Sequence, residues 1–167
     1  FHIQKRESGE IIYYMPYHTA ENNVAKALVE LSLGQRDEIT LDIDKGIEKI
    51  QSVQGISFGQ KQKTAIKSSL ESGVTVITGG PGTGKTTIIN AIIQLAERDG
   101  LEVVLAAPTG RAAKRITETT GKVAKTIHRL LEISFLDDDL EFSKGEENPI
   151  EGDIVIVDEV SMMDILL

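Results

Sequence analysis

The stretch Gly79-Gly80-Pro81-Gly82-Thr83-Gly84-Lys85-Thr86-Thr87 decides the fold, because it fills every fixed position of the phosphate-binding pattern G-x-x-x-x-G-K-[ST]. Residues 74–78 before it read VTVIT, which is typical of a short buried strand, and residues 87–96 after it carry apolar side chains at helical spacing. In such a unit, glycines let backbone N–H groups approach phosphate oxygens, and the helix start adds partial positive charge. A chance glycine-rich turn is the alternative, expected in about one chain of this length in a hundred or fewer. The sequence therefore predicts binding of a nucleoside triphosphate.

The positions of this loop have separate expected roles toward ATP and Mg²⁺. Lys85 is expected to reach the β- and γ-phosphates, and the Thr86 hydroxyl is expected to bind Mg²⁺. The loop residues expected to contact the nucleotide are Gly79, Gly80, Pro81, Gly82, Thr83, Gly84, Lys85, Thr86 and Thr87.

A second part of the nucleotide site is predicted where the apolar run 154–157 ends in Asp158 and Glu159. Carboxylates at the C-terminal end of a parallel strand lie where open α/β sheets gather their ligands. Asp158 is expected to hold Mg²⁺, and Glu159 to orient and deprotonate the attacking water. A small-molecule kinase needs no carboxylate to activate water, so the pair favours ATP hydrolysis, with Lys85, Asp158 and Glu159 as catalytic residues.

Gln62 is a candidate for contact with the adenine base, because it lies one short helix before the strand 74–78. A glutamine amide can donate to and accept from one adenine edge at once. A solvated helix glutamine is the alternative, which this residue taken alone favours. Gln60 competes for the same role.

The order of elements from residue 56 onward predicts an α/β fold. Helices are expected over 59–72, 87–100, 111–118 and 124–133, and strands over 74–78, 101–107 and 153–159. Alternating strands and helices imply right-handed crossovers, and so a parallel sheet within a three-layer sandwich. The acidic stretch 134–152 is expected to be a loop or a poor hairpin.

Residues 1–55 are expected to form a mainly helical lead-in to the ATPase domain 56–167. Thr19 is the expected N-cap of a helix that ends near Gly34 and carries Val24, Ala27, Leu28 and Leu31 on one face. A second helix is expected from Asp44 to Gly55, with Ile47, Ile50 and Val53 facing inward.

Composition limits the possible functions of the 167 residues. The 18 basic and 26 acidic residues give a net charge of −8, which argues against a generally basic nucleic-acid coat. Residues 107–133, however, contain six basic residues and only two acidic ones. Cysteine is absent, which excludes disulfides and thiolate metal sites. No apolar run approaches the roughly 20 residues of a membrane span, so we expect no membrane partner and a cytoplasmic location.

Four runs occur in a recognisable order: GGPGTGKTT at 79–87, APTGRAAKR at 107–115, TIHRLL at 126–131 and IVDEVSMMD at 156–164. Together they resemble the first RecA-like motor domain of a superfamily 1 DNA helicase, of the RecD-like branch (exodeoxyribonuclease V alpha-subunit type). The resemblance covers about residues 56–167, and the Q-x-x-A-I run around Gln62 matches the adenine-reading motif of that family. Residues 10–34 also resemble the segment that precedes the motor in stand-alone RecD-like helicases.

The resemblance implies that single-stranded DNA contacts Thr109, Gly110, Arg111, Thr126 and His128. The residues alone favour plainer roles: Thr109 as a helix N-cap, Arg111 on a solvated helix face and His128 as a hydrogen-bonded core residue. The parent would be an ATP-dependent helicase moving 5′ to 3′ in recombination and repair. Its partners would be single-stranded DNA, a second RecA-like domain and the subunits of a nuclease complex.

The chain ends before the later motifs of that family, so we expect it to be a fragment of the motor. An arginine finger, which the second domain would supply, is worth about 10³–10⁵ in rate, so the fragment alone should hydrolyse ATP very slowly. Two other classes stay open at this point. One is a P-loop ATPase that acts on protein partners, and the other is a non-enzymatic, nucleotide-dependent interaction module.

Overall fold

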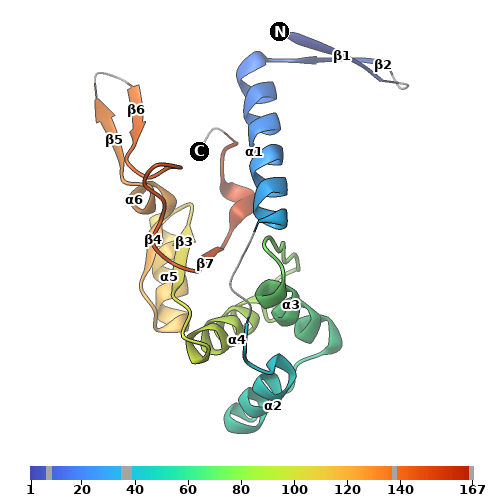
Figure 1. Ribbon diagram of the computed structural model, residues 1–167, viewed down its shortest axis with the longest axis vertical. Helices are drawn as coiled ribbons and strands as arrows, with labels where there is room; N and C mark the ends of the chain where they lie inside the picture. The colour runs from blue at the N-terminus through green and yellow to red at the C-terminus, as the bar shows by residue number, and fades with distance from the viewer. Residues whose placement is uncertain (7–8, 35–38, 137–138, 166–167) are drawn as a thin grey trace.

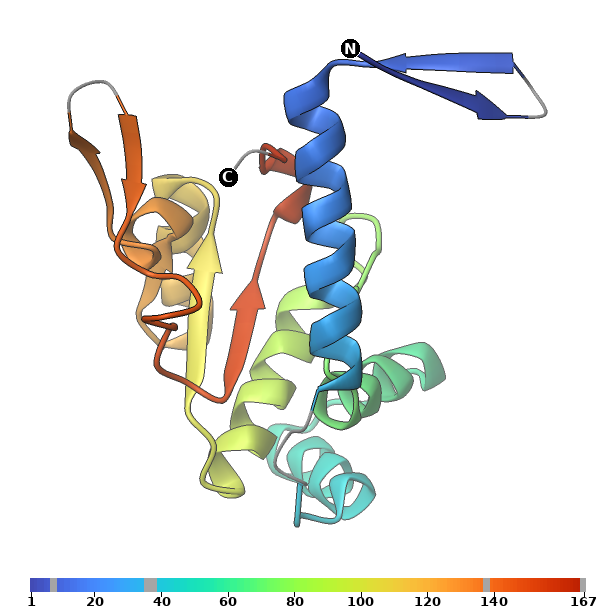
Figure 2. The same ribbon diagram turned by 45° about the horizontal axis from the view of Figure 1, so that its top comes forward.

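Three parallel strands form the sheet that organises the molecule, in the order β4 (Ala124–Thr126), β3 (Val103–Ala107) and β7 (Ile154–Val157). The computed structural model describes residues 1–6, 9–34, 39–136 and 139–165. Leu105 pairs with Ala124 on one side and with Ile156 on the other. All three strands run toward the same end of the molecule (Figure 2), so the residues that follow them share one sheet edge.

Apolar side chains of β3 alternate between two cores, as expected for a strand covered on both faces. Val103 and Leu105 belong to the larger core, with α2 (Ile43–Gln54), α3 (Gln60–Glu71), α4 (Lys85–Arg98) and Ile116 of α5 (Gly110–Thr120). Ala106 faces the other way and packs with Ile127 and Leu130 of α6 (Ile127–Leu130). The predicted α/β fold with a parallel sheet is confirmed.

The helix α2 shares its core with α3, α4 and β3, because Ile43, Ile47 and Ile50 are buried in the larger cluster. Asp42 caps its start by accepting a hydrogen bond from the Lys45 N–H at 3.1 Å, and Gly55 ends it in a left-handed conformation. The stop at Gly55 is confirmed. The inward position predicted for Val53 is wrong, because 74% of its surface is exposed. The division near residue 56 stays a prediction.

The N-terminal segment forms a hairpin of β1 (His2–Arg6) and β2 (Gly9–Tyr13), followed by α1 (Met15–Leu33) (Figure 1). The predicted N-cap at Thr19 is wrong, because the helix begins one turn earlier with Pro16 in its first turn, where a missing N–H costs nothing. No residue of α1 is buried, and Leu28 and Leu31 on the predicted apolar face are exposed.

Two further predictions differ from the structure. Residues 74–78 form no strand: Val76 is 81% exposed, and Thr75 Oγ1 instead donates to the Ser68 carbonyl at 2.9 Å. A strand requires a paired neighbour, and β-branched composition alone supplies only an extended backbone. The helix expected over 124–133 begins only at Ile127, because residues 124–126 pair with β3 as strand β4.

The acidic stretch contains the expected hairpin, made of β5 (Ile133–Leu136) and β6 (Asp139–Phe142). Asp137 and Asp138 lie outside the described residues. After β7 the chain makes one short 3₁₀ turn, η1 (Val160–Met162). Within the described ranges, no helix is long and apolar enough to cross a membrane.

Candidate nucleotide and nucleic-acid site

The glycine-rich loop adopts a backbone that only glycine adopts freely. Gly82 and Gly84 have φ angles of 74° and 84°, and α4 starts at Lys85, directly after Gly84. Side chains at such positive φ are strained, and the helix start orients free backbone N–H groups toward the loop. The loop and the first turn of α4 therefore have the backbone form that phosphate binding requires.

The Lys85 ammonium lies over this loop. Its Nζ donates to the Gly79 carbonyl at 2.7 Å and to the Gly80 carbonyl at 2.9 Å. Thr83 Oγ1 donates to the same Gly80 carbonyl at 2.9 Å. These contacts hold Lys85, the residue expected to bind the phosphates, against the backbone of the loop. Thr86 is the next residue on the first turn of α4.

The Gln62 side chain connects α3 to the phosphate loop. Its Oε1 accepts from the Gly59 N–H at 2.8 Å, and its Nε2 donates to the Thr83 carbonyl at 3.0 Å. A Cβ added at Gly84 would lie 2.5 Å from that Nε2, so the amide is packed against the loop. Gln60, the competing candidate, is exposed, and its carbonyl accepts a hydrogen bond from Thr64 Oγ1. The amide that reaches the loop is therefore that of Gln62.

The sheet register places the other predicted site residues in a row along one edge. Ala107 pairs with Thr126, and Thr109 follows two residues after Ala107, so both threonines lie where neighbouring parallel strands end. Ala106 pairs with Val157, and the Asp158 N–H donates to the Ala106 carbonyl at 3.0 Å. The helix α4 also begins at the end of the molecule toward which β3 and β7 run (Figure 2). The residues that follow β3, β4 and β7 thus share the C-terminal edge of the sheet, and α4 begins toward the same end of the molecule (Figure 2).

The two acids after β7 have different surroundings. Asp158 is half-buried, and its Oδ1 accepts from the Glu159 N–H at 2.9 Å. Glu159 is exposed and has φ 56° and ψ 36°, a left-handed conformation that is uncommon outside glycine. Such strain is frequent at functional sites. In the described part of the chain, no hydrogen bond or ion pair joins either acid to the phosphate loop.

The predicted DNA-contacting residues combine capping with exposure. Thr109 caps α5 by accepting from the Ala112 N–H at 3.2 Å, and Thr126 caps α6 by accepting from the Arg129 N–H at 3.2 Å. The N-cap role considered for Thr109 is therefore present. His128 is exposed, which contradicts its alternative role as a core residue, and Gly110 and Arg111 are exposed at the start of α5.

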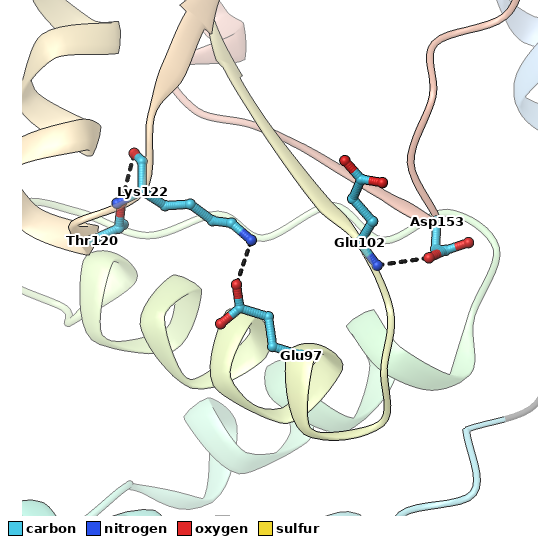
Figure 3. Close-up of polar contacts among 5 residues, drawn as sticks. All are labelled: Glu97, Glu102, Thr120, Lys122 and Asp153. Carbon is cyan, nitrogen blue, oxygen red and sulfur yellow. Dashed lines mark hydrogen bonds and ion pairs between the residues drawn. The ribbon is translucent and has the colours of Figure 1, made fainter.

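The basic stretch 107–133 does not act as one surface, because Lys122 faces elsewhere. It lies before β4, at the opposite edge of the sheet, and its ammonium pairs with Glu97 near the end of α4 (Figure 3). At this edge Asp153 Oδ2 accepts from the Glu102 N–H at 2.6 Å and ties the starts of β7 and β3 together (Figure 3). Lys122 is thus a scaffold residue, which charge counting alone did not reveal.

Residues 62–167 match the family described as AAA domain. The chain belongs to this family. Along nearly its whole length this AAA-domain chain also resembles RecD-like helicases, which confirms the resemblance found in the motifs. It is 35% identical to the ATP-dependent RecD2 DNA helicase of Deinococcus radiodurans over 163 residues, covering 98% of this chain and 22% of that protein.

Two further relatives carry names of the same kind. The RecBCD enzyme subunit RecD of Mycolicibacterium smegmatis is 31% identical over 182 aligned positions, covering 95% of this chain and 31% of that subunit. The ATP-dependent DNA helicase dda of Enterobacteria phage T4 is 39% identical over 92 positions, covering 53% of this chain and 21% of that helicase. The chain spans less than a third of the length of each of these relatives.

Proposed function

We propose that this chain is the nucleotide-binding part of the first motor domain of an ATP-dependent DNA helicase that moves along single-stranded DNA. The observation that carries the proposal is the shared sheet edge. The Asp158–Glu159 pair and the strand-end residues Thr109 and Thr126 belong to it, and the helix that follows the complete phosphate loop begins toward the same end of the molecule (Figure 2). The names of the relatives, which are DNA helicases and RecBCD subunits, support it.

The loop would hold the triphosphate of ATP, with the Lys85 ammonium leaving the Gly79 and Gly80 carbonyls for the β- and γ-phosphates. The Thr86 hydroxyl and the Asp158 carboxylate are hard oxygen donors of the kind Mg²⁺ prefers, so they fit that ion. When bound, Mg²⁺ would neutralise charge that develops on the phosphates. Gln62 would read adenine, and it would first have to exchange its bonds to Gly59 and Thr83 for bonds to the base.

In the hydrolytic step, Glu159 would accept a proton from the attacking water. The water oxygen bonds to the γ-phosphorus, the bond from that phosphorus to the β–γ bridging oxygen breaks, and ADP leaves with the electron pair. A carboxylate on an exposed turn is well placed to contact water. The strained backbone of Glu159 would fix where that carboxylate lies.

Single-stranded DNA would follow the edge formed by Thr109, Gly110, Arg111, Thr126 and His128, in a cytoplasmic protein. Hydroxyls and N–H groups at the two helix starts can bind phosphate oxygens. Movement 5′ to 3′, a role in recombination and repair, completion of the site by a second RecA-like domain and assembly into a nuclease complex belong to the proposal as finer points. They rest on the resemblance to RecD-like helicases.

The nucleotide half of the proposal is tested in the full-length parent protein by separating binding from turnover. Glu159→Gln should keep Mg-ATP affinity and abolish DNA-stimulated hydrolysis, because only the proton acceptor is removed. Asp158→Asn should weaken the Mg²⁺-dependent part of ATP binding, and Lys85→Ala should weaken binding severely. Normal turnover by Glu159→Gln would place the general base elsewhere.

The DNA half is tested with a matched pair of basic residues. Arg111→Ala should weaken binding to oligo(dT) and reduce ATPase stimulation, whereas Lys122→Ala should leave oligo(dT) affinity unchanged, because its ammonium pairs with Glu97 at the opposite edge. Equal reductions for the two variants would mean that charge, and not position, governs binding. A parent protein whose ATPase responds to a protein partner but not to DNA would contradict the helicase proposal.

A further inference from the structure

Six aromatic rings gather where the β1–β2 hairpin meets the start of α1. Three of them form a half-buried inner group, in which His2 stacks on His18 at a ring distance of 4.1 Å and Tyr13 lies 5.0 Å from His18. The Asn22 amide lies 3.2 Å from His18 Nε2 and also donates to the His18 carbonyl at 2.7 Å. The inner group therefore fixes the hairpin to the helix.

The other three rings form an outer group. Phe1, Tyr14 and Tyr17 are 86%, 58% and 48% exposed. Tyr14 lies 6.1 Å from Phe1 and 5.8 Å from Tyr17, at interplanar angles of 60° and 63°. Rings tilted in this way contact edge to face, so the ring faces that do not meet a neighbouring edge remain open to a ligand. Aromatic side chains in this arrangement cost little entropy to present and offer large contact area.

The position of the outer group relates it to the proposed DNA path. The β1–β2 hairpin and the start of α1 lie at the end of the molecule toward which β3 and β7 run, as the β5–β6 hairpin also does (Figures 1 and 2). The sheet edge with Thr109 and Thr126 faces this end. Exposed apolar side chains also lie beside the rings, Ile3 and Ile12 on the hairpin and Met15 at the start of α1, so an apolar protein interface is the alternative that the experiment must separate.

We propose that the outer rings Phe1, Tyr14 and Tyr17 stack against unpaired bases of single-stranded DNA beyond the motor edge. The inference rests on the proposed helicase function and adds an interaction that the motor motifs do not include. Every base has a π-face, so such a site binds without sequence preference. On the hairpin, Lys5 pairs with Glu10 at 3.7 Å, so these two charges offset each other. The site therefore binds bases by stacking and adds little to phosphate neutralisation.

The experiment uses the full-length parent and fluorescent oligo(dT) of increasing length. The double variant Tyr14→Leu/Tyr17→Leu keeps apolar bulk but removes the π-faces, and its affinity for long oligomers should fall by about 10- to 100-fold. Tyr14→Phe/Tyr17→Phe should bind as the parent does. Leu33→Ala, at the far end of α1 and 80% exposed, is the matched control and should have no effect. Helix content by circular dichroism checks that the variants fold.

The salt dependence of binding separates stacking from phosphate neutralisation. The leucine double variant should keep the parent's slope of log affinity against log salt, whereas a variant with one phosphate fewer neutralised at the motor edge should have a slope shallower by about 0.7. Oligomers carrying 5-iodouracil should photocrosslink to Tyr14 or Tyr17, as mapped by mass spectrometry. Unchanged affinity of the leucine variant, with a parent that binds DNA, would overturn this inference alone.

Two other outcomes are also decisive. A parent that fails to bind single-stranded DNA would overturn the proposed function itself. If the alanine variant Tyr14→Ala/Tyr17→Ala no longer bound a protein partner that the leucine variant still binds, with DNA affinity unchanged, the rings would form an apolar protein interface. That result would overturn the nucleic-acid assignment.

Discussion

Gly46 lies where α2 packs most closely on α4, the helix that begins at the phosphate loop. A Cβ at this position would overlap the Leu95 Cδ2 methyl and lie 3.4 Å from the Leu41 Cδ2 methyl. Replacing glycine by alanine inside a helix is normally stabilising by about 1 kcal/mol. Leu95 is fully buried and cannot turn away, so overpacking should cost about 1–3 kcal/mol. The balance of the two terms predicts that Gly46→Ala destabilises the fold, by at most about 2 kcal/mol.

A double-mutant cycle, measured by urea unfolding and circular dichroism, tests this reasoning. Leu95→Ala alone should cost about 2–5 kcal/mol. In that background the overlapping Cδ2 methyl of residue 95 is absent, so Gly46→Ala should become stabilising by about 1 kcal/mol. The sign reversal is the diagnostic, because pairs in contact couple and distant pairs do not. Ser52→Ala on the exposed face of α2 is the control for helix propensity. Stabilisation by Gly46→Ala in the parent background would refute the close packing of the two helices.

Two further outcomes are expected. Gly84→Ala combines strain at φ 84° with a Cβ placed 2.5 Å from Gln62 Nε2, so Mg-ATP affinity by calorimetry should fall roughly tenfold or more. Hydrogen bonds from the Thr40 hydroxyl and N–H hold the pKa of Asp99 below its ordinary value of 3.8. The stabilisation by these hydrogen bonds is fully present above the pKa of Asp99 in the unfolded chain, and it is lost as the pH falls through the pKa of Asp99 in the folded protein. Asp99→Asn should therefore lower the free energy of unfolding at pH 7 and make it fall less steeply with decreasing pH below about pH 4. An unchanged steepness below about pH 4 would contradict the role of Thr40.

The parts of the site that the sequence predicted well are those fixed by local geometry. Gly82 and Gly84 mark positions of positive φ, and the helix that starts at Lys85 is the direct consequence of the loop before it. The sequence did not indicate that the Gln62 amide donates to the Thr83 carbonyl, 21 positions away. No periodicity reveals such a long-range hydrogen bond. The left-handed backbone of Glu159 was likewise invisible, since glutamate gives no sign of it.

The parts that failed depend on tertiary partners. The five residues 74–78 are as β-prone as any in the chain, yet they form no ladder, because pairing is decided by the neighbour and not by the segment. Residues 124–126 show the reverse case, in which β3 draws a short run into the sheet although helical spacing follows it. The apolar stripe of α1 has helical spacing, but spacing does not say whether another element covers it.

Lys122 and Arg129 illustrate a rule that the sequence could have supplied. Both belong to one basic stretch, and counting charge treats them alike. Strand direction separates them: a residue before a parallel strand lies at its N-terminal edge, and a residue after the strand lies at the edge where ligands gather. Lys122 precedes β4 and pairs with Glu97, whereas Arg129 follows β4 on a helix capped by Thr126. In a parallel sheet, the position of a charge relative to its strand therefore says more about function than its place in a basic run.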